Sequence, residues 1–177
     1  MNLWHDIPAG ENFPEEINVI IEVPKGSQNK YELDKETGLI HLDRANYSAA
    51  AYPCEYGYVP QTLAEDGDAM DVLLLSSFPI PPGILVKMRP VAYMEMIDTG
   101  EADAKIIGVP VKDKRWEGVR DLSDINPHTL KEIQHFFETY KELKGDKVEI
   151  PGFKNKATAV QALKESLDLY QKKFPKQ

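Results

Sequence analysis

Four acidic side chains lie within seven residues of the chain, directly before a short apolar segment. They are Glu65, Asp66, Asp68 and Asp71, followed by Val72–Leu75. Two carboxylates ~4 Å apart repel each other by about 1 kcal/mol in water and by about 4 kcal/mol at the effective dielectric of a protein surface. Hard divalent cations such as Mg²⁺, Mn²⁺ and Ca²⁺ prefer oxygen ligands. The cluster therefore predicts either a solvated acidic turn or a site for divalent metal ions.

The most familiar calcium-binding loop does not fit these residues. An EF-hand loop has glycine at its sixth position and oxygen ligands at its first, third and fifth positions. Counted from Asp66, the fifth residue is Met70 and the sixth is Asp71. A strand is also expected where an EF-hand has its second helix. The choice between a solvated turn and a metal site therefore depends on the rest of the chain.

The first predicted strands carry charged residues that could face a site. Ile17–Val23 is predicted to be a strand, and Glu22 interrupts its apolar pattern. Lys30–Asp34 alternates strictly, so Lys30 and Glu32 share one face of a second strand. Such charges are ordinary on the wet face of an antiparallel strand, and they could equally line a cavity.

Residues suited to binding phosphate lie between these strands and the acidic cluster. Arg44 ends the return strand predicted over residues 39–44, and arginine can hold a phosphate through two parallel hydrogen bonds. The following segment, Tyr52–Pro60, is rich in Tyr, Gly and Pro. If it is extended, Tyr56 and Tyr58 share a face. Tyrosines are more often packed in a core, but these would bring hydroxyl donors close to the acidic residues.

A second acidic segment follows the long strand predicted over residues 84–97. Residues 98–103 are predicted to be its hairpin loop, with Asp98 and Asp103 near the two ends. Lys105 follows in the returning strand and shares a face with Asp103. A solvated hairpin is the ordinary interpretation of this pattern, and a second set of metal ligands is the functional one.

Two helices are predicted in the last third of the chain. Asn126 is a good N-cap and Pro127 suits the first helical position. The apolar stripe of this helix ends at Tyr140, beside Lys141. Asn155 is expected to cap the second helix. Several short strands followed by helices predict an α+β fold that is mainly β, a small antiparallel OB-like β-barrel with peripheral helices, two of them C-terminal.

The bulk properties limit the possible functions. A chain of 177 residues is expected to form a single domain over residues 1–177. The net charge of −8 argues against a general nucleic-acid binder, although bound metal can reverse the local sign for an anionic substrate. Cys54 is the only cysteine, so a reducing compartment, the cytoplasm, is expected. No signal peptide and no membrane-spanning segment are expected.

The motifs taken together resemble the soluble inorganic pyrophosphatases of the single-domain bacterial type. Asp66–Val72 resembles the signature of that family. Six further groups match its landmarks in order, and the resemblance runs from about residue 8 to residue 145. These groups are Ile21–Pro24, Lys30–Asp34, Asp43–Arg44, Tyr52–Tyr58, Asp98–Lys105 and Phe136–Lys141.

The resemblance implies a role for each candidate. The implied ligands of several Mg²⁺ ions are Asp66, Asp71 and Asp103, with Glu22, Glu32 and Asp98 completing the carboxylates around them. Asp68 is implied as the general base, or as the group that orients the attacking hydroxide. The groups implied to hold the two phosphates are Lys30, Arg44, Tyr56, Tyr140 and Lys141, with Lys105 in the same wall.

The sequence departs from the family pattern at two positions. Ala69 stands where the family usually has proline, which leaves the loop less restricted in φ but removes no ligand. Thr99 stands where many bacterial relatives have a second acid after the aspartate matching Asp98. The number of outer metal-binding carboxylates is therefore open.

The implied activity is hydrolysis of pyrophosphate to two orthophosphates by metal-activated water. Metal ions lower the pKa of bound water and neutralise phosphoryl charge, and the remaining task is positioning and electrostatic stabilisation. The resemblance also implies a homohexamer of two trimers, with no nucleic-acid or membrane partner. The main alternative is an OB-like nucleic-acid-binding module without catalysis, which would need a basic groove.

Overall fold

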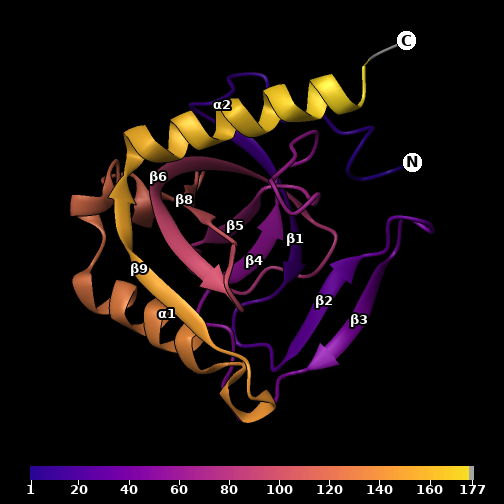
Figure 1. The fold of residues 1–177 in the computed structure, drawn as a ribbon. Coiled ribbons are helices and arrows are strands. Elements are labelled where there is room, and N and C mark those ends of the chain that lie inside the picture. The colour runs from indigo at the N-terminus through magenta and orange to yellow at the C-terminus, as the bar shows by residue number, and fades with distance from the viewer. Residues whose placement is uncertain (176–177) are drawn as a thin grey trace.

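The structure, a computed structural model, describes residues 1–175 and is mainly β with two α-helices (Figure 1). The strands are β1 (Ile17–Val23), β2 (Asn29–Leu33), β3 (Ile40–Ala45), β4 (Glu55–Tyr58), β5 (Asp71–Leu74), β6 (Leu85–Asp98), β7 (Glu101–Ala102), β8 (Lys105–Pro110) and β9 (Val148–Asn155). The helices are α1 (Pro127–Thr139) and α2 (Lys156–Lys173), and short 3₁₀ turns lie at Lys114–Trp116, Leu122–Asp124 and Glu142–Lys144.

Five strands form a hydrogen-bonded ring. The order is β1-β4-β5-β8-β6, and β6 pairs with β1 to close it. The long strand β6 makes this possible because it curves around the ring (Figure 1). Its first residues pair with β1, its middle pairs with β8, and its last part pairs with β9 and β7.

One pairing in the ring differs from the antiparallel arrangement that the sequence predicted. β5 and β8 run parallel, with Val72 opposite Ile106 and Leu74 opposite Gly108. The prediction was wrong here because the hairpin pattern relates only consecutive strands, and β8 forms a hairpin-like pair with β6 rather than with β5. In the parallel pair both strands begin at the same edge of the sheet, so Asp71 and Lys105 start side by side.

The predicted helix caps are confirmed, but only one helix is C-terminal. The side chain of Asn126 accepts a hydrogen bond from the His128 N–H, and that of Asn155 accepts one from the Thr158 N–H. Strand β9, which the sequence analysis did not predict, separates the two helices and pairs with β6. Within the described residues, no helix combines the length and the apolar character needed to span a bilayer.

The two helices cover separate parts of the ring (Figure 1). Ile133, Phe136 and Phe137 of α1 pack in one buried cluster with residues of β6, β8 and β9. Ala159 and Leu163 of α2 pack in a second cluster with the apolar residues of β1 and β5. The ring is therefore fixed from two directions, which holds its strand ends in place.

The strands β2 and β3 form a separate two-stranded sheet beside the ring (Figure 1). Lys30 lies opposite Arg44 in this hairpin, and Glu32 lies opposite His41. The Leu33 N–H donates to Oε1 of Glu22 at 2.8 Å and so ties the hairpin to β1. The hairpin thus places two cations next to the edge of the ring that carries Glu22.

Gly57 allows β4 to approach β1 closely. A Cβ atom at this position would lie 2.1 Å from the carbonyl oxygen of Ile20 and 3.1 Å from the Cα of Ile21. Both contacts are with backbone atoms, so neither can move aside as a flexible side chain would. The glycine therefore sets the spacing between the strands that carry Glu22 and Tyr56.

We expect Gly57→Ala to destabilise the protein by at least the ~1–3 kcal/mol typical of overpacking a well-packed interior. Chemical denaturation followed by far-UV circular dichroism measures this loss. Gly118→Ala is the matched control, because nothing lies within 4 Å of a Cβ built there. Equal stability of the two variants would contradict the close-approach argument.

Candidate active site

A cavity of about 590 Å³ opens between the ring and the β2–β3 hairpin. Eight of the thirteen candidate residues line it, namely Glu22, Lys30, Glu32, Tyr56, Asp66, Asp68, Asp71 and Asp103. They come from β1, β2, β4, the loop before β5, the start of β5 and the loop before β8. Segments far apart in sequence therefore bring their carboxylates to one cavity, as a shared metal site requires.

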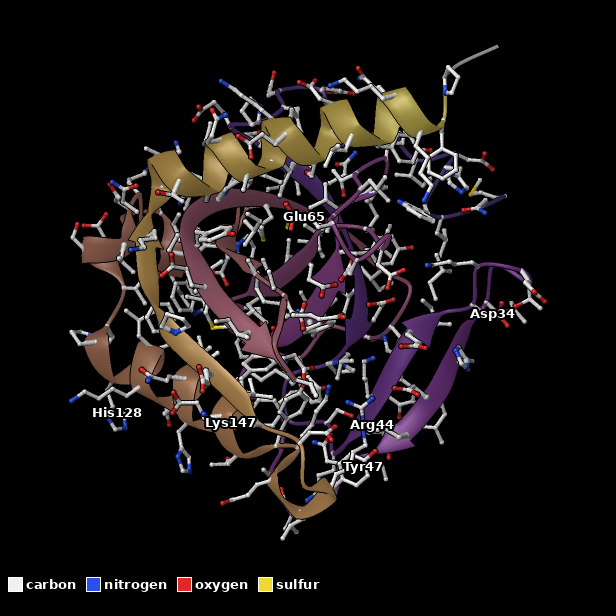
Figure 2. The ribbon with its side chains drawn as sticks, in the orientation of Figure 1. Asp34, Arg44, Tyr47, Glu65, His128 and Lys147 are labelled. Carbon is white, nitrogen blue, oxygen red and sulfur yellow. The ribbon has the colours of Figure 1, made fainter. Side chains whose placement is uncertain are left out.

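The other five candidates lie beside the cavity rather than in its lining. Lys105 is paired with Asp71 and Asp103 of the cavity wall. Lys141 is paired with Asp98. Arg44 donates to Asp43 at 2.5 Å, and its positive charge acts on the buried Tyr140. Figure 2 shows Arg44 on the side of the hairpin that faces the ring, with Asp34 at the opposite end of the hairpin.

The buried ammonium group of Lys105 joins two of the candidate metal ligands. Its side chain is 1% exposed, its Nζ lies 2.6 Å from Oδ2 of Asp71, and it also pairs with Asp103. Burial alone would lower the pKa of Lys105, but the charges of the two aspartates outweigh it and raise that pKa well above its usual range. Lys105 therefore keeps its charge and holds the two carboxylates together.

Tyr56 completes this group of contacts. Its hydroxyl donates to Oδ2 of Asp71 at 2.6 Å, so that one oxygen accepts from both Tyr56 and Lys105. The Lys105 ammonium also lies 5.4 Å from the centre of the Tyr56 ring, within the range of a cation–π contact. Burial and the nearby charges of Asp71 and Asp103 raise the pKa of Tyr56. The phenol therefore stays a neutral donor.

The carboxyl group of Asp103 is buried among other charged groups, which shift its pKa. Burial raises its pKa, and the negative charges of Asp71 and Asp66 raise it further, against the opposing effect of Lys105. A cation bound among these three carboxylates would relieve that repulsion. This is the behaviour expected of residues gathered for a metal ion rather than of a solvated turn.

Glu22 lies at an irregularity in the β1–β4 pairing. Ile21 is opposite Gly57 and Val23 is opposite Tyr56, so Glu22 is the extra residue of a β-bulge. The bulge directs its side chain into the cavity, where burial and then the charge of Asp71 raise its pKa to about 8. Near neutral pH the carboxyl group of the metal-free protein therefore keeps its proton.

Asp68 lies in a tight turn and is an exposed residue of the cavity wall. Its backbone N–H donates to Oδ1 of Asp66 at 2.9 Å, and Gly67 between them has a positive φ of 89°. The side chain of Asp68 is 57% exposed and pairs with the ammonium group of Lys35, from the hairpin connection. It is free to meet a substrate or water molecule that enters the cavity.

The geometry agrees with the comparison to known proteins. A family model described as inorganic pyrophosphatase matches residues 19–171. The chain belongs to the inorganic pyrophosphatase family. Among curated relatives, the soluble inorganic pyrophosphatase of Zea mays is 47% identical over 167 residues, covering 94% of this chain and 78% of that protein. The inorganic pyrophosphatase of Geobacillus stearothermophilus is 47% identical over 154 residues, covering 87% and 93%.

A solved structure shares the fold almost throughout. The crystal structure of the inorganic pyrophosphatase from Thermus thermophilus superposes with a TM-score of 0.94 at 42% identity and covers 97% of this chain and 99% of that one. The mainly β ring with its two helices is therefore the architecture of this pyrophosphatase family.

The side chains around the cavity suit a hard divalent cation. All the charged candidate ligands are carboxylates, the donor type that Mg²⁺ and Mn²⁺ prefer. Within residues 1–175 no three Asp, Glu, His or Cys side chains stand close enough to chelate an ion as they are. Lysine ammonium groups explain this spacing, because Lys105 lies between Asp71 and Asp103 and Lys35 is paired with Asp68. Acidic side chains that attract cations in this way fit the metal that the family pattern implies.

Thr99 lies in the hairpin turn at the edge of this site. Thr99 and Gly100 both have positive φ, 52° and 88°, as a type I′ two-residue turn requires. The Thr99 hydroxyl donates to Oδ1 of Asp98 at 2.9 Å. Burial would raise the pKa of Asp98, but the hydrogen bonds from Lys141 and Thr99 outweigh it and lower that pKa. Thr99, which departs from the expected family pattern, thus supports the carboxylate of Asp98.

Several residues of the cavity wall were not among the candidates. They are Trp4, Leu33, Asp34, Lys35, Glu36, His41, Tyr58 and Ala69. Trp4 comes from the irregular N-terminal segment, where no periodic pattern gives it a position. Tyr58 shares the strand of Tyr56, and that spacing was the one available signal for it.

We expect the metal-free protein to lose stability as pH rises from about 4.5 to about 8, through Glu22. The unfolded chain releases this proton near 4.5 while the folded chain keeps it to about 8, so the folded state binds more protons in that window and the free energy of unfolding falls. Each pKa unit corresponds to about 1.4 kcal/mol. Urea denaturation in chelator at a series of pH values measures the slope.

Glu22→Gln is expected to remove that part of the slope, whereas Glu142→Gln, at an exposed position, is expected to leave it unchanged. If wild type and Glu22→Gln have the same dependence on pH between these values, Glu22 is not protonated in the folded state.

Proposed function

We propose that the protein hydrolyses inorganic pyrophosphate to two orthophosphates in this cavity. The reaction depends on bound divalent metal ions, and Mg²⁺ is the ion we propose. The observation that carries the proposal is the convergence of Asp66, Asp71 and Asp103 on one cavity that also contains Lys30 and Tyr56. An acidic wall alone would bind metal but repel the substrate, and a basic wall alone would supply no nucleophile. Membership of the pyrophosphatase family supports the same conclusion.

The proposed metal ligands are carboxylates of the ring edge and one of the neighbouring hairpin, Glu32. They are Asp66, Asp71 and Asp103, with Glu22, Glu32 and Asp98 around them. When bound, the metal supplies a more acidic water molecule and neutralises charge on the phosphoryl oxygens. Lys105 keeps Asp71 and Asp103 at a fixed separation, and Tyr56 fixes the rotamer of Asp71 through its hydrogen bond.

The proposed phosphate side lies on the hairpin and at the end of α1. Lys30 and Arg44 are cross-strand partners, so both cations lie at the same position of the hairpin. Glu32 and Asp43 raise the pKa of Lys30, and Asp43 raises that of Arg44. In both cases the acidic neighbours outweigh the opposite effect of burial. Tyr140 and Lys141 approach from the other side, where Lys141 is paired with Asp98.

Asp68 is proposed as the group that accepts the proton from the attacking water. Its half-exposed carboxylate has one side-chain contact in the described structure, the ion pair with Lys35. A pair between exposed groups is weak, with a median contribution of about 0–1 kcal/mol. Substrate can therefore displace Lys35 from Asp68 at small cost.

The fold, assembly and location are proposed by resemblance. We infer that the five-stranded ring is an OB-like barrel and that residues 1–177 are one domain. By the same resemblance we also propose a homohexamer of two trimers in the cytoplasm. The nucleic-acid-binding alternative is not favoured, because half of the residues that line the cavity are acidic and only two are lysines.

Phosphate release from pyrophosphate is the direct test. We expect rapid release with millimolar Mg²⁺, loss of release when EDTA exceeds Mg²⁺, and recovery when Mg²⁺ is added back. ATP serves as the control substrate, and slower release from it is expected. Absence of phosphate release at all Mg²⁺ concentrations would reject the proposed activity.

We expect Asp68→Asn to lower kcat by about 10²–10⁴-fold, the usual contribution of a general base, while pyrophosphate still binds. Steady-state kinetics measure turnover, and calorimetry with Ca²⁺ in place of Mg²⁺ measures binding. Asp168→Asn is the matched control, since Asp168 is exposed on α2. Turnover of Asp68→Asn close to that of wild type would remove Asp68 from this role.

A further inference from the structure

The β2–β3 hairpin brings a second lysine, Lys35, to the cavity. Lys35 lies in the connection between the two strands and lines the cavity together with Lys30. Figure 2 shows its neighbour Asp34 at the end of the hairpin away from Arg44. The carboxylate of Asp34 accepts a hydrogen bond from the N–H of Glu36 at 2.8 Å. The turn that carries Lys35 is therefore fixed by a contact that spans it.

Two groups from outside the hairpin contact the ammonium group of Lys35. It forms an ion pair with Asp68, and its Nζ lies 5.4 Å from the centre of the Trp4 ring, within the range of a cation–π contact. Asp68 and Trp4 both line the cavity as well. The three side chains therefore meet at the part of the cavity where Asp68 is proposed to accept a proton.

The Trp4 ring is held in place, whereas the ion pair is exposed. Trp4 is 5% exposed, and its Nε1–H donates to the carbonyl oxygen of Thr62 at 2.9 Å. The side chains of Lys35 and Asp68 are 53% and 57% exposed, and an ion pair between groups as exposed as these is weak. The contact with the ring does not depend on Asp68. Lys35 can therefore exchange Asp68 for another anion while its ammonium group stays beside the ring.

Pyrophosphate is an anion that suits this exchange. It carries more negative charge than a single carboxylate, and an ammonium group offers three N–H donors that rotate freely. The cavity has only two lysines among the residues that line it, so each of them matters for an anionic substrate. The side chain of Lys105 is 1% exposed and already paired with Asp71 and Asp103. Lys35 is therefore much more accessible to an entering phosphate group than Lys105 is.

We propose that Lys35 is a further substrate-contacting residue, whose ammonium group passes from Asp68 to a phosphoryl oxygen of pyrophosphate when the substrate enters. The inference rests on the proposed function. The exchange frees the carboxylate of Asp68 for the attacking water once the phosphate group is in place, and the Trp4 ring keeps the ammonium group on that side of the cavity. Lys30 and Arg44 are paired at the other end of the hairpin, so they contact the substrate from a different direction.

Lys35→Met removes the ammonium group but keeps a long, unbranched side chain beside the Trp4 ring. We expect KM for pyrophosphate to rise by about 10- to 100-fold, the factor that corresponds to one hydrogen bond to a charged group. We expect kcat to change much less, because a contact made equally in the ground state and the transition state affects binding alone. Calorimetry with Ca²⁺ in place of Mg²⁺ should show the same loss of pyrophosphate affinity. Lys35→Arg keeps the charge and is expected to bind pyrophosphate more tightly than Lys35→Met.

Titration of the substrate-free protein with Mg²⁺ separates this role from general damage to the site. We expect Lys35→Met to bind Mg²⁺ as tightly as wild type or more tightly, because an ammonium group no longer competes with the ion for Asp68. Lys87→Met is the matched control and is expected to bind pyrophosphate as wild type does. The side chain of Lys87 is also 53% exposed, its Nζ lies 3.8 Å from Oε2 of Glu11, and it does not line the cavity.

Three results would count against the proposals. An unchanged KM and pyrophosphate affinity of Lys35→Met would overturn the inference even if the wild type hydrolyses pyrophosphate, and tighter Mg²⁺ binding in that case would show that Lys35 only occupies the place of a metal ion. A parallel loss of Mg²⁺ and pyrophosphate binding would overturn it too, because the effect would then be structural. A wild type that does not hydrolyse pyrophosphate at any Mg²⁺ concentration would overturn the proposed function as well.

Discussion

The contact between Lys105 and the two carboxylates of Asp71 and Asp103 holds the candidate site together. Burial of an ammonium group costs several kcal/mol unless opposite charges accompany it, and Lys105 is 1% exposed. It therefore requires both aspartates, and each aspartate requires it to limit repulsion from the other. Because Asp71 starts β5 and Lys105 starts the parallel strand β8, the pairing of these strands and the ion pairs specify the same arrangement.

Local departures from regular sheet structure direct the remaining groups into the cavity. The bulge at Glu22 turns a carboxyl group inward from a fully buried strand, and Gly57 lets β4 pack against the backbone of β1. The hairpin places Lys30 beside Arg44 as cross-strand partners. Most of the acidic groups of the cavity thus lie on ring strands or on the loops that lead into them, whereas Lys30, Glu32 and Arg44 lie on the hairpin.

Much of the local structure could be predicted, because its causes are local. Asn126 and Asn155 cap their helices through bonds to residues two or three positions away, and the alternating pattern from Lys30 gives a strand. Strand β9 was missed because its hydrogen bonds go to β6, about 55 residues earlier in the chain. Trp4 was missed because its place in the cavity wall depends on packing against Tyr170 and Phe174 at the other end of the chain.

The sequence by itself determined the donor types, their local order and the family pattern to which Asp66, Asp68 and Asp71 belong. Only the tertiary structure decided that Asp103 meets Asp71, since a parallel pair joins strand starts and an antiparallel pair would have separated them. It also decided that burial and the charge of Asp71 raise the pKa of Glu22 to about 8, and that the Tyr58 hydroxyl has no hydrogen-bond partner among residues 1–175. Both properties depend on desolvation, and desolvation is set by what distant segments pack around a group rather than by its neighbours in the chain.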